Sequence, residues 1–178
     1  MTDSPNTQSD RPRAHRTVVI GALAGTVLGW LLFTWLFGFI LAPQAAQAAD
    51  RLAYAAAWML PIAIVLFLMT LATGLGRHFS GQSDPTLIAD SRYVDISRRV
   101  LTNTVEQSLI FALGALAMAE LTPAGQLGML GALTILFVIA RIAFWIGYLR
   151  DPLYRYPGMA LTLQINAVII IWDIVHLL

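Results

Sequence analysis

The stretch Leu127–Leu149, LGMLGALTILFVIARIAFWIGYL, decides the fold class of this chain. It is apolar almost throughout, and its length is close to the roughly 20 residues that a helix needs to cross a hydrocarbon core of about 30 Å. Lipid offers the backbone no hydrogen-bond partners, so such a run must be a helix that satisfies its own N–H and C=O groups. The stretch therefore predicts a transmembrane helix.

Four further apolar runs accompany this stretch. The composition agrees with them, because 58% of the 178 residues are hydrophobic and only 12% are charged, whereas soluble domains carry charges at about a quarter of their positions. We therefore expect an all-α integral membrane protein, a bundle of five transmembrane helices. The other runs are Thr17–Ala42, Leu52–Leu75, one that begins near Val94 with charged residues and is apolar over Leu109–Leu121, and Met159–Leu178.

The first run has flanks that resemble those of a signal peptide, with three arginines before it and an alanine-rich segment after Ala42. A signal core spans about 7–15 residues, and Thr17–Ala42 is much longer, so we expect an uncleaved helix. The polar residues 1–16 are expected to be disordered. The expected organisation is a disordered cytoplasmic N-terminus (1–16), an extra transmembrane helix (17–42) and a main four-helix bundle (52–178).

Arginine placement predicts the orientation, because basic residues collect in cytoplasmic loops. The connections that lack this enrichment carry only Arg51, or Glu120 without a base. The N-terminus and the one long loop, Gly76–Asp95, are therefore predicted to be cytoplasmic, and the C-terminus to face out. The arginines that set this orientation are Arg11, Arg13, Arg16, Arg77, Arg92, Arg98, Arg99, Arg150 and Arg155.

The third run carries a polar stripe of Arg99, Asn103 and Glu106. Steps of four and three place these side chains on one face of a helix. Charged groups at membrane depth mark either a function or an internal partner. Two interpretations stay open at this point, an ion-pair network that joins helices and a polar binding pocket.

The fourth run carries a second stripe at the same spacing, Arg141, Trp145 and Tyr148. Arg141 and Glu106 are expected at similar depth on neighbouring helices, so we predict that they form a buried ion pair. Together the two stripes predict a pocket that opens toward the cytoplasm. Its cations suit carboxylates, and Glu106 suits an ammonium group.

Small residues recur at Gly21, Gly25 and Gly29, a spacing of four on the first run. This pattern favours close helix contact in membranes. Contact within the bundle and contact between subunits are both compatible with it.

Several classes of site are excluded or disfavoured. The chain has no cysteine, which excludes disulfides, thiolate metal sites and a cysteine nucleophile. It has no hydrolase, zinc-protease or phosphate-loop motif, and its net charge of +1 gives no sign of nucleic-acid binding. Asp173 and His176 offer two metal ligands without a third, so a capping or interface role is favoured there and no metal is expected.

The two stripes together resemble the MAPEG family, the membrane-associated proteins of eicosanoid and glutathione metabolism. The resemblance rests on Arg99-Val-Leu-Thr-Asn103-Thr-Val-Glu106 and Ala140-Arg141-Ile-Ala-Phe-Trp-Ile-Gly-Tyr148, and it covers roughly Leu52–Leu178. It implies a four-helix protomer that forms a homotrimer in a bacterial-type inner membrane. It also implies glutathione as a co-substrate, bound between subunits near the cytoplasmic side.

The resemblance also implies roles for individual residues. Arg155 would stabilise the glutathione thiolate, with Arg150 as the rival, and the intervening Asp151-Pro152 is expected to turn the chain so that Arg155 returns over the pocket mouth. Two positions depart from some members, Gln107 and Phe144, where those members have tyrosine. By position, the glutathione contacts would be Arg99, Asn103, Glu106, Arg141 and Tyr148.

The function expected from this resemblance is a glutathione transferase or peroxidase that acts on a lipophilic electrophile reaching the site from the membrane lipid. The alternative is a non-enzymatic bundle with a lipid-binding or scaffolding role. A small transporter is disfavoured, because the sequence shows no inverted repeat and no pair of broken helices.

Overall fold

A computed structural model describes residues 11–43, 47–81 and 91–178. Over these ranges the chain is helical and contains no strand, and five helices are long and apolar enough to cross a membrane. The predicted all-α membrane fold is thereby confirmed. The helices are α1 (Arg11–Phe39), α2 (Ala48–Phe79), α3 (Arg92–Leu121), α4 (Gly128–Arg150) and α5 (Tyr156–Leu177), with short 3-10 helices η1 (Ala124–Gln126) and η2 (Pro152–Arg155) in two connections.

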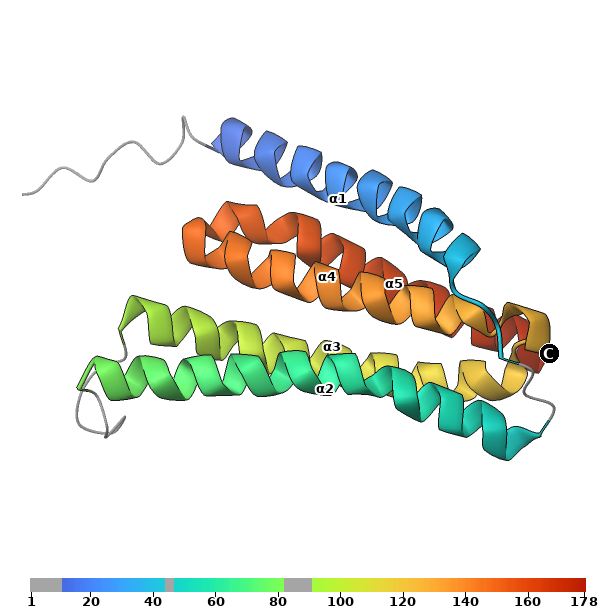
Figure 1. The fold of residues 1–178 in the computed structure, drawn as a ribbon. Coiled ribbons are helices and arrows are strands. Elements are labelled where there is room, and N and C mark those ends of the chain that lie inside the picture. The colour runs from blue at the N-terminus through green and yellow to red at the C-terminus, as the bar shows by residue number, and fades with distance from the viewer. Residues whose placement is uncertain (1–10, 44–46, 82–90) are drawn as a thin grey trace, which may run out of the picture.

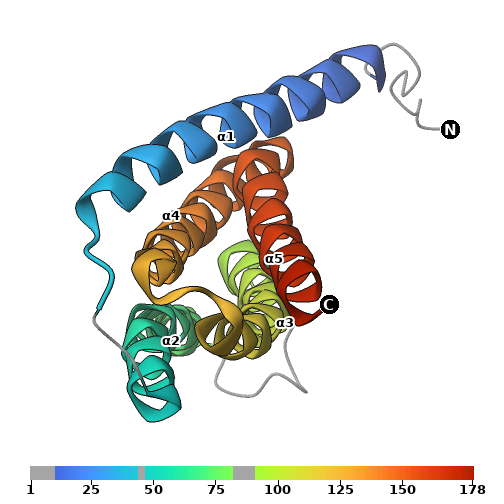
Figure 2. The same cartoon turned by 90° about the vertical axis from the view of Figure 1, so that its right-hand side faces the viewer.

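Helices α2 to α5 form a four-helix bundle, and α1 lies outside it across α4 and α5 (Figures 1 and 2). In the most apolar part of each helix, 61% of α4 is buried within the protein but only 6% of α1. Helix α4 is therefore the centre of the core, and α1 is peripheral. The rings of Phe111 and Phe137, with centroids 4.8 Å apart, pack at the middle of the core. The architecture is thus a four-helix bundle with one extra N-terminal helix.

Four helices, α1, α2, α3 and α5, begin before the apolar runs that predicted them, whereas α1 ends at Phe39, before the predicted Ala42. Helix α1 begins at Arg11 rather than Thr17, so residues 11–16 are helical and not disordered; residues 1–10 lie outside the described residues. Arginine is a good helix former and continues a helix once it has been nucleated. The apolar run therefore marks the membrane-crossing part of α1 and not its full length.

The predicted Gly76–Asp95 loop is likewise shorter than expected, because α2 continues to Phe79 and α3 already begins at Arg92. Ser91 caps α3 by accepting a hydrogen bond from the backbone N–H of Val94 at 3.4 Å. Serine at this position satisfies a backbone donor that the first helical turn leaves open. The part of the loop at 82–90 lies outside the described residues.

One end of the bundle holds the start of α1, the end of α2, the start of α3 and the α4–α5 connection (Figure 1). This end carries Arg77, Arg92, Arg98, Arg99, Arg150 and Arg155, and we call it the arginine-rich end. At the opposite end, Arg51 donates to the carbonyls of Ala119, Glu120 and Thr122 at 3.2, 2.9 and 2.8 Å, and so caps the C-terminus of α3. The predicted alternation of the helices agrees with this arrangement, while the side on which each end lies stays a prediction.

Candidate functional site

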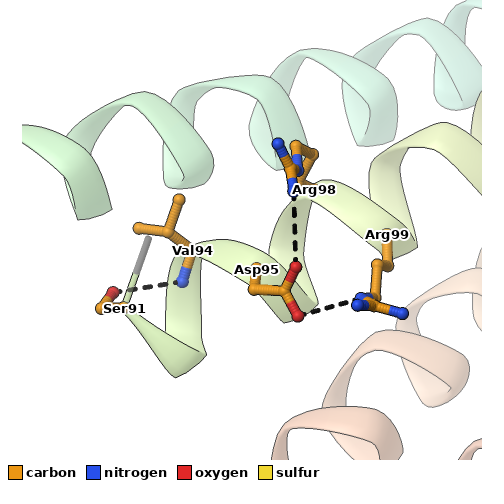
Figure 3. Close-up of polar contacts among 5 residues, drawn as sticks. All are labelled: Ser91, Val94, Asp95, Arg98 and Arg99. Atoms are coloured by element: carbon orange, nitrogen blue, oxygen red, sulfur yellow. Dashed lines mark hydrogen bonds and ion pairs between the residues drawn. The ribbon is translucent and has the colours of Figure 1, made fainter. Parts of the chain in front are cut away.

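The polar face of α3 begins at the arginine-rich end with a small ion-pair cluster (Figure 3). The carboxylate of Asp95 accepts from Arg99 Nε at 2.9 Å and contacts Arg98 Nη2 at 3.5 Å. Both arginine side chains are more than half exposed, so these pairs orient the guanidinium groups and contribute little to stability. Both guanidinium groups lie on the outer face of α3.

That outer face carries a hollow of about 410 Å³, lined by Arg98, Arg99, Thr102, Asn103 and Glu106. The prediction that Arg99, Asn103 and Glu106 share one face of the helix is confirmed. Glu106 is exposed in the single protomer. A charged carboxylate is costly against lipid, so this face requires water, a ligand or another protein surface over it.

A second hollow of about 230 Å³ adjoins the first and shares Arg99 and Asn103 with it. Helix α4 contributes aromatic side chains to its wall, and the α4–α5 connection contributes Arg155. The hollows therefore join the polar face of α3 to the turn after α4. The residues that line the second hollow are Arg99, Asn103, Phe144, Tyr148, Arg155 and Met159.

Arg155 reaches this hollow because the chain turns directly after α4, as Asp151-Pro152 predicted. The Asp151 carboxylate accepts from the backbone N–H of Leu153 at 2.7 Å and so caps η2. The guanidinium carbon of Arg155 then lies 4.8 Å from the centroid of the Tyr148 ring. Its Nε is buried and has no hydrogen-bond partner among the described residues. Arg150, by contrast, is exposed and does not line the hollow.

Arg141 lies behind the two hollows and is fully buried. Its Nε and Nη2 donate to Thr104 Oγ1 at 3.1 and 2.8 Å, and Nη2 also donates to Asn103 Oδ1 at 3.0 Å. A longer bond of 3.5 Å joins Nη1 to Thr162 Oγ1 on α5, and the guanidinium lies over the Phe144 ring at 4.3 Å. Arg141 thus ties α3, α4 and α5 together and fixes the amide of Asn103.

The predicted buried pair between Glu106 and Arg141 is wrong for the single protomer. Both residues lie in the described part of the chain, Glu106 is exposed, and Arg141 is bound to Thr104 and Asn103 instead. At 100° per residue, the side chain of Glu106 is rotated by about 200° around the helix axis from that of Thr104. It therefore projects from the opposite side of α3. Similar depth along two helices does not make two side chains neighbours when one of them faces outward.

The sequence profile of the MAPEG family matches residues 52–175, which comprise most of the four-helix bundle α2–α5. The chain belongs to the MAPEG family. This family includes glutathione-dependent transferases and peroxidases. The match leaves α1 outside the family region, so α1 is an addition to the MAPEG bundle. No curated protein and no solved structure gives a significant match to the chain.

The MAPEG bundle contains polar contacts that the sequence analysis missed. The hydroxyls of Thr104 and Thr162 are the acceptors for Arg141, and both side chains are fully buried. A signal was available in the sequence, since a guanidinium inside a membrane needs acceptors and hydroxyl side chains on neighbouring helices supply them. Thr104 lies beside Asn103 in the same stretch that carries the family resemblance.

Gln107 and Phe144, the two departures from some MAPEG members, both turn inward. Asn166 Nδ2 on α5 donates to the side-chain oxygen of Gln107 at 2.9 Å and to its backbone carbonyl at 3.2 Å. Phe144 is nearly buried and supports Arg141. Gln107 therefore contributes to packing between α3 and α5. Phe144 packs beside Arg141 and also forms part of the wall of the second hollow.

The far end of α5 carries Asp173 and His176, which the sequence assigned to capping or interface roles. The imidazole Nδ1 of His176 lies 2.9 Å from the carbonyl of Trp172, and the two rings stack 4.1 Å apart. Trp172 Nε1 in turn donates to Thr122 Oγ1 at 2.9 Å. Within the described ranges, no group of three potential metal ligands comes together.

Proposed function

We propose that this protein is a glutathione-dependent membrane transferase or peroxidase that acts on a lipophilic electrophile. The observation that supports the proposal best is the pair of joined hollows, which bring Arg99 and Asn103 together with Tyr148 and Arg155 beside an exposed Glu106. Membership in the MAPEG family supplies the class of ligand.

The charges around the hollows match the charges of glutathione. Glutathione has two carboxylates, one ammonium group and one thiol. Guanidinium groups bind carboxylates through charge-assisted hydrogen bonds, a role that Arg98 and Arg99 fit, and Glu106 fits the ammonium group. In this proposal Arg141 acts on glutathione through Asn103, whose side chain it holds; a direct contact between Arg141 and glutathione stays a prediction.

Arg155 is proposed as the group that stabilises the thiolate. A nearby cation lowers the pKa of a thiol, and the thiolate is the nucleophile. In a transferase the sulfur forms a bond to an electrophilic carbon, and the leaving group departs with its electron pair. In a peroxidase the thiolate attacks a hydroperoxide oxygen and the O–O bond breaks to give an alcohol. The resulting sulfenic acid is then reduced by a second glutathione, which yields the disulfide and water.

The proposal includes a homotrimer with the ligand between subunits. The exposed carboxylate of Glu106 lies on a helix that crosses the membrane, and burial against another copy would remove it from lipid. The same contact would close the hollows, which are open in the single protomer. The site is thus completed by the assembly.

Calorimetric titration of glutathione into the purified protein tests this proposal. We expect binding to the wild type and about tenfold or greater weakening in Glu106→Gln, because a charged hydrogen bond contributes about 1.5–3 kcal/mol. Glu120→Gln is the matched control, since Glu120 is also exposed on α3 but lies at its other end. Absence of binding at millimolar glutathione would refute the proposal and favour a scaffolding or lipid-binding bundle.

A further inference from the structure

The turn that carries Arg155 is packed tightly against α4. A Cβ added to Gly147 would lie 2.7 Å from the carbonyl carbon of Tyr154, and one added to Gly158 would lie 2.5 Å from the backbone nitrogen of Phe144. Both distances are too short for a side chain. The backbone on either side of Arg155 therefore rests directly on the backbone of α4.

Helix α1 packs through its glycine stripe against the residues that directly follow this turn. A Cβ at Gly21 would lie 3.3 Å from Pro157 Cγ, and one at Gly25 would lie 2.6 Å from the Pro157 carbonyl oxygen and 2.8 Å from its Cα. One turn further on, Gly29 packs against Leu161. The stripe thus makes its contact within the chain, with the first turns of α5, and its closest approach to backbone atoms, at Pro157, is two residues from Arg155.

Polar contacts fix the register of α1 on α5. The side-chain amide of Gln164 donates to Thr26 Oγ1 at 2.6 Å and accepts from Trp30 Nε1 at 3.0 Å. All three residues lie in membrane-crossing helices, where an unsatisfied amide is costly. Helix α1 is therefore docked in one position, although it is outside the MAPEG region.

Arg155 has little else to hold its side chain. Its guanidinium lies over the rings of Tyr148 and Tyr156, at 4.8 and 5.3 Å, and its buried Nε has no hydrogen-bond partner among the described residues. The position of the guanidinium therefore depends on the backbone of the turn. Pro157 has a φ fixed near −65°, so a displacement of Pro157 is transmitted to the turn rather than absorbed at that residue.

We propose that α1 is a positioning element for Arg155. The contact of Gly25 with Pro157 holds the start of α5, and with it the adjoining η2 turn, in place against α4. The proposal rests on the proposed role of Arg155 in stabilising the glutathione thiolate. Helix α1 would thus position a residue of the site from outside the region that matches the family. Gly25 and Pro157 are positioning residues and touch no substrate.

The test compares Gly25→Val with Gly38→Val in the full-length protein. Gly38 lies near the C-terminal end of the same helix, and a Cβ there meets nothing within 4 Å, so only the first variant disturbs α5. In Gly25→Val we expect the pH midpoint of the bound thiolate to rise by about one unit and kcat to fall about tenfold. Glutathione affinity should change less than about twofold. Unchanged thiolate titration and kcat in Gly25→Val would overturn the proposal.

Gln164→Leu provides a second route if Gly25→Val does not fold, because it removes both hydrogen bonds to α1 without adding a clash with Pro157. It should shift the thiolate midpoint in the same direction, and an unshifted midpoint would count against the proposal.

A spin label gives a readout that does not depend on glutathione. The chain has no cysteine, so Tyr154→Cys, at a position 57% exposed, accepts one label on the turn. We expect the label to be more mobile in the Gly25→Val background than in the otherwise unchanged protein. In the Gly38→Val background its mobility should not increase. Absence of a thiolate signal in the wild type would refute the proposed function but not the positioning role of α1. Equal label mobility in both backgrounds would refute the positioning role of α1, whatever glutathione does.

Discussion

The guanidinium of Arg141 is bound by neutral oxygens in the part of the chain that the structure describes. Thr104, Asn103 and Thr162 accept its hydrogen bonds from two different helices. A buried charge is tolerated only when its donors are satisfied. The hydroxyls are therefore as necessary to the bundle as a carboxylate partner would have been.

Replacement of Thr104 by valine tests this dependence. The change removes the acceptor for Arg141 Nε and Nη2 and leaves two buried donors unsatisfied, so the free energy of unfolding should fall by about 1–3 kcal/mol. Thermal unfolding in detergent measures it. Thr102→Val is the control, because Thr102 is exposed on the same helix and should change stability by less than about 0.5 kcal/mol. Equal melting of both variants would show that Arg141 has other acceptors.

The proposed thiolate role of Arg155 can be separated from that of Arg150 by two alanine variants. Arg155 lines the second hollow, whereas Arg150 is exposed outside it. Arg155→Ala should remove the thiolate absorbance near neutral pH and lower turnover by about a hundredfold, which corresponds to about 2.7 kcal/mol. Arg150→Ala should retain both. The opposite pattern would assign the role to Arg150. A thiolate signal in both variants would show that neither arginine of this turn stabilises the thiolate.

At the scale of the elements, α3 has two faces with opposite roles. One face, with Val100, Thr104 and Phe111, is buried in the bundle. The other exposes Glu106 and, two turns further along, Leu113, which is 63% exposed. A polar residue on an outward face of a membrane helix indicates a contact outside the protomer, so α3 is the element that we expect at the subunit interface.

Single cysteines test this interface in the cysteine-free chain. We expect Leu113→Cys to form disulfide-linked subunit pairs under mild oxidation, because copies of α3 would face one another. Leu31→Cys on α1 is matched in exposure, at 62%, and should stay uncrosslinked because the outer face of α1 contacts lipid. Gel electrophoresis without reductant measures both. Linked pairs through Leu31→Cys but not through Leu113→Cys would place the subunit interface on α1 instead of α3.

The extra helix α1 shows why a weakly buried element can still be specifically placed. Only 6% of its most apolar stretch is buried within the protein. Three glycines and two side-chain hydrogen bonds nevertheless fix it on α5. In a bilayer apolar area does not drive helix association, so close backbone approach and hydrogen bonds decide it. Its attachment therefore depends on a few contacts rather than on a large interface.

At the scale of the whole molecule, the arginine-rich end predicts the orientation in the membrane. Ser80 follows α2 at that end, and Gln126 lies in η1 at the opposite end. Labelling by an impermeant thiol reagent in intact cells should reach Gln126→Cys and not Ser80→Cys. Labelling of Ser80→Cys alone would reverse the topology, while the helix arrangement would be unaffected.

The sequence by itself determined the membrane-crossing helices and the relations within each helix or turn. Apolar runs located the five spans, because the thickness of the bilayer fixes a minimum length. The helical period placed Arg99, Asn103 and Glu106 on one face, and Asp151-Pro152 predicted the turn that returns Arg155. Each of these follows from neighbours along the chain, where backbone geometry alone sets the relative positions.

Only the tertiary structure decided how whole helices are rotated against one another. Rotation of α3 directs Thr104 toward Arg141 and Glu106 outward, and docking on α5 assigns the glycine stripe of α1 to a contact within the chain. The period of a helix fixes angles within that helix but leaves its rotation about its own axis free. That rotation results from the summed packing of all neighbouring helices, which no single stretch of sequence contains.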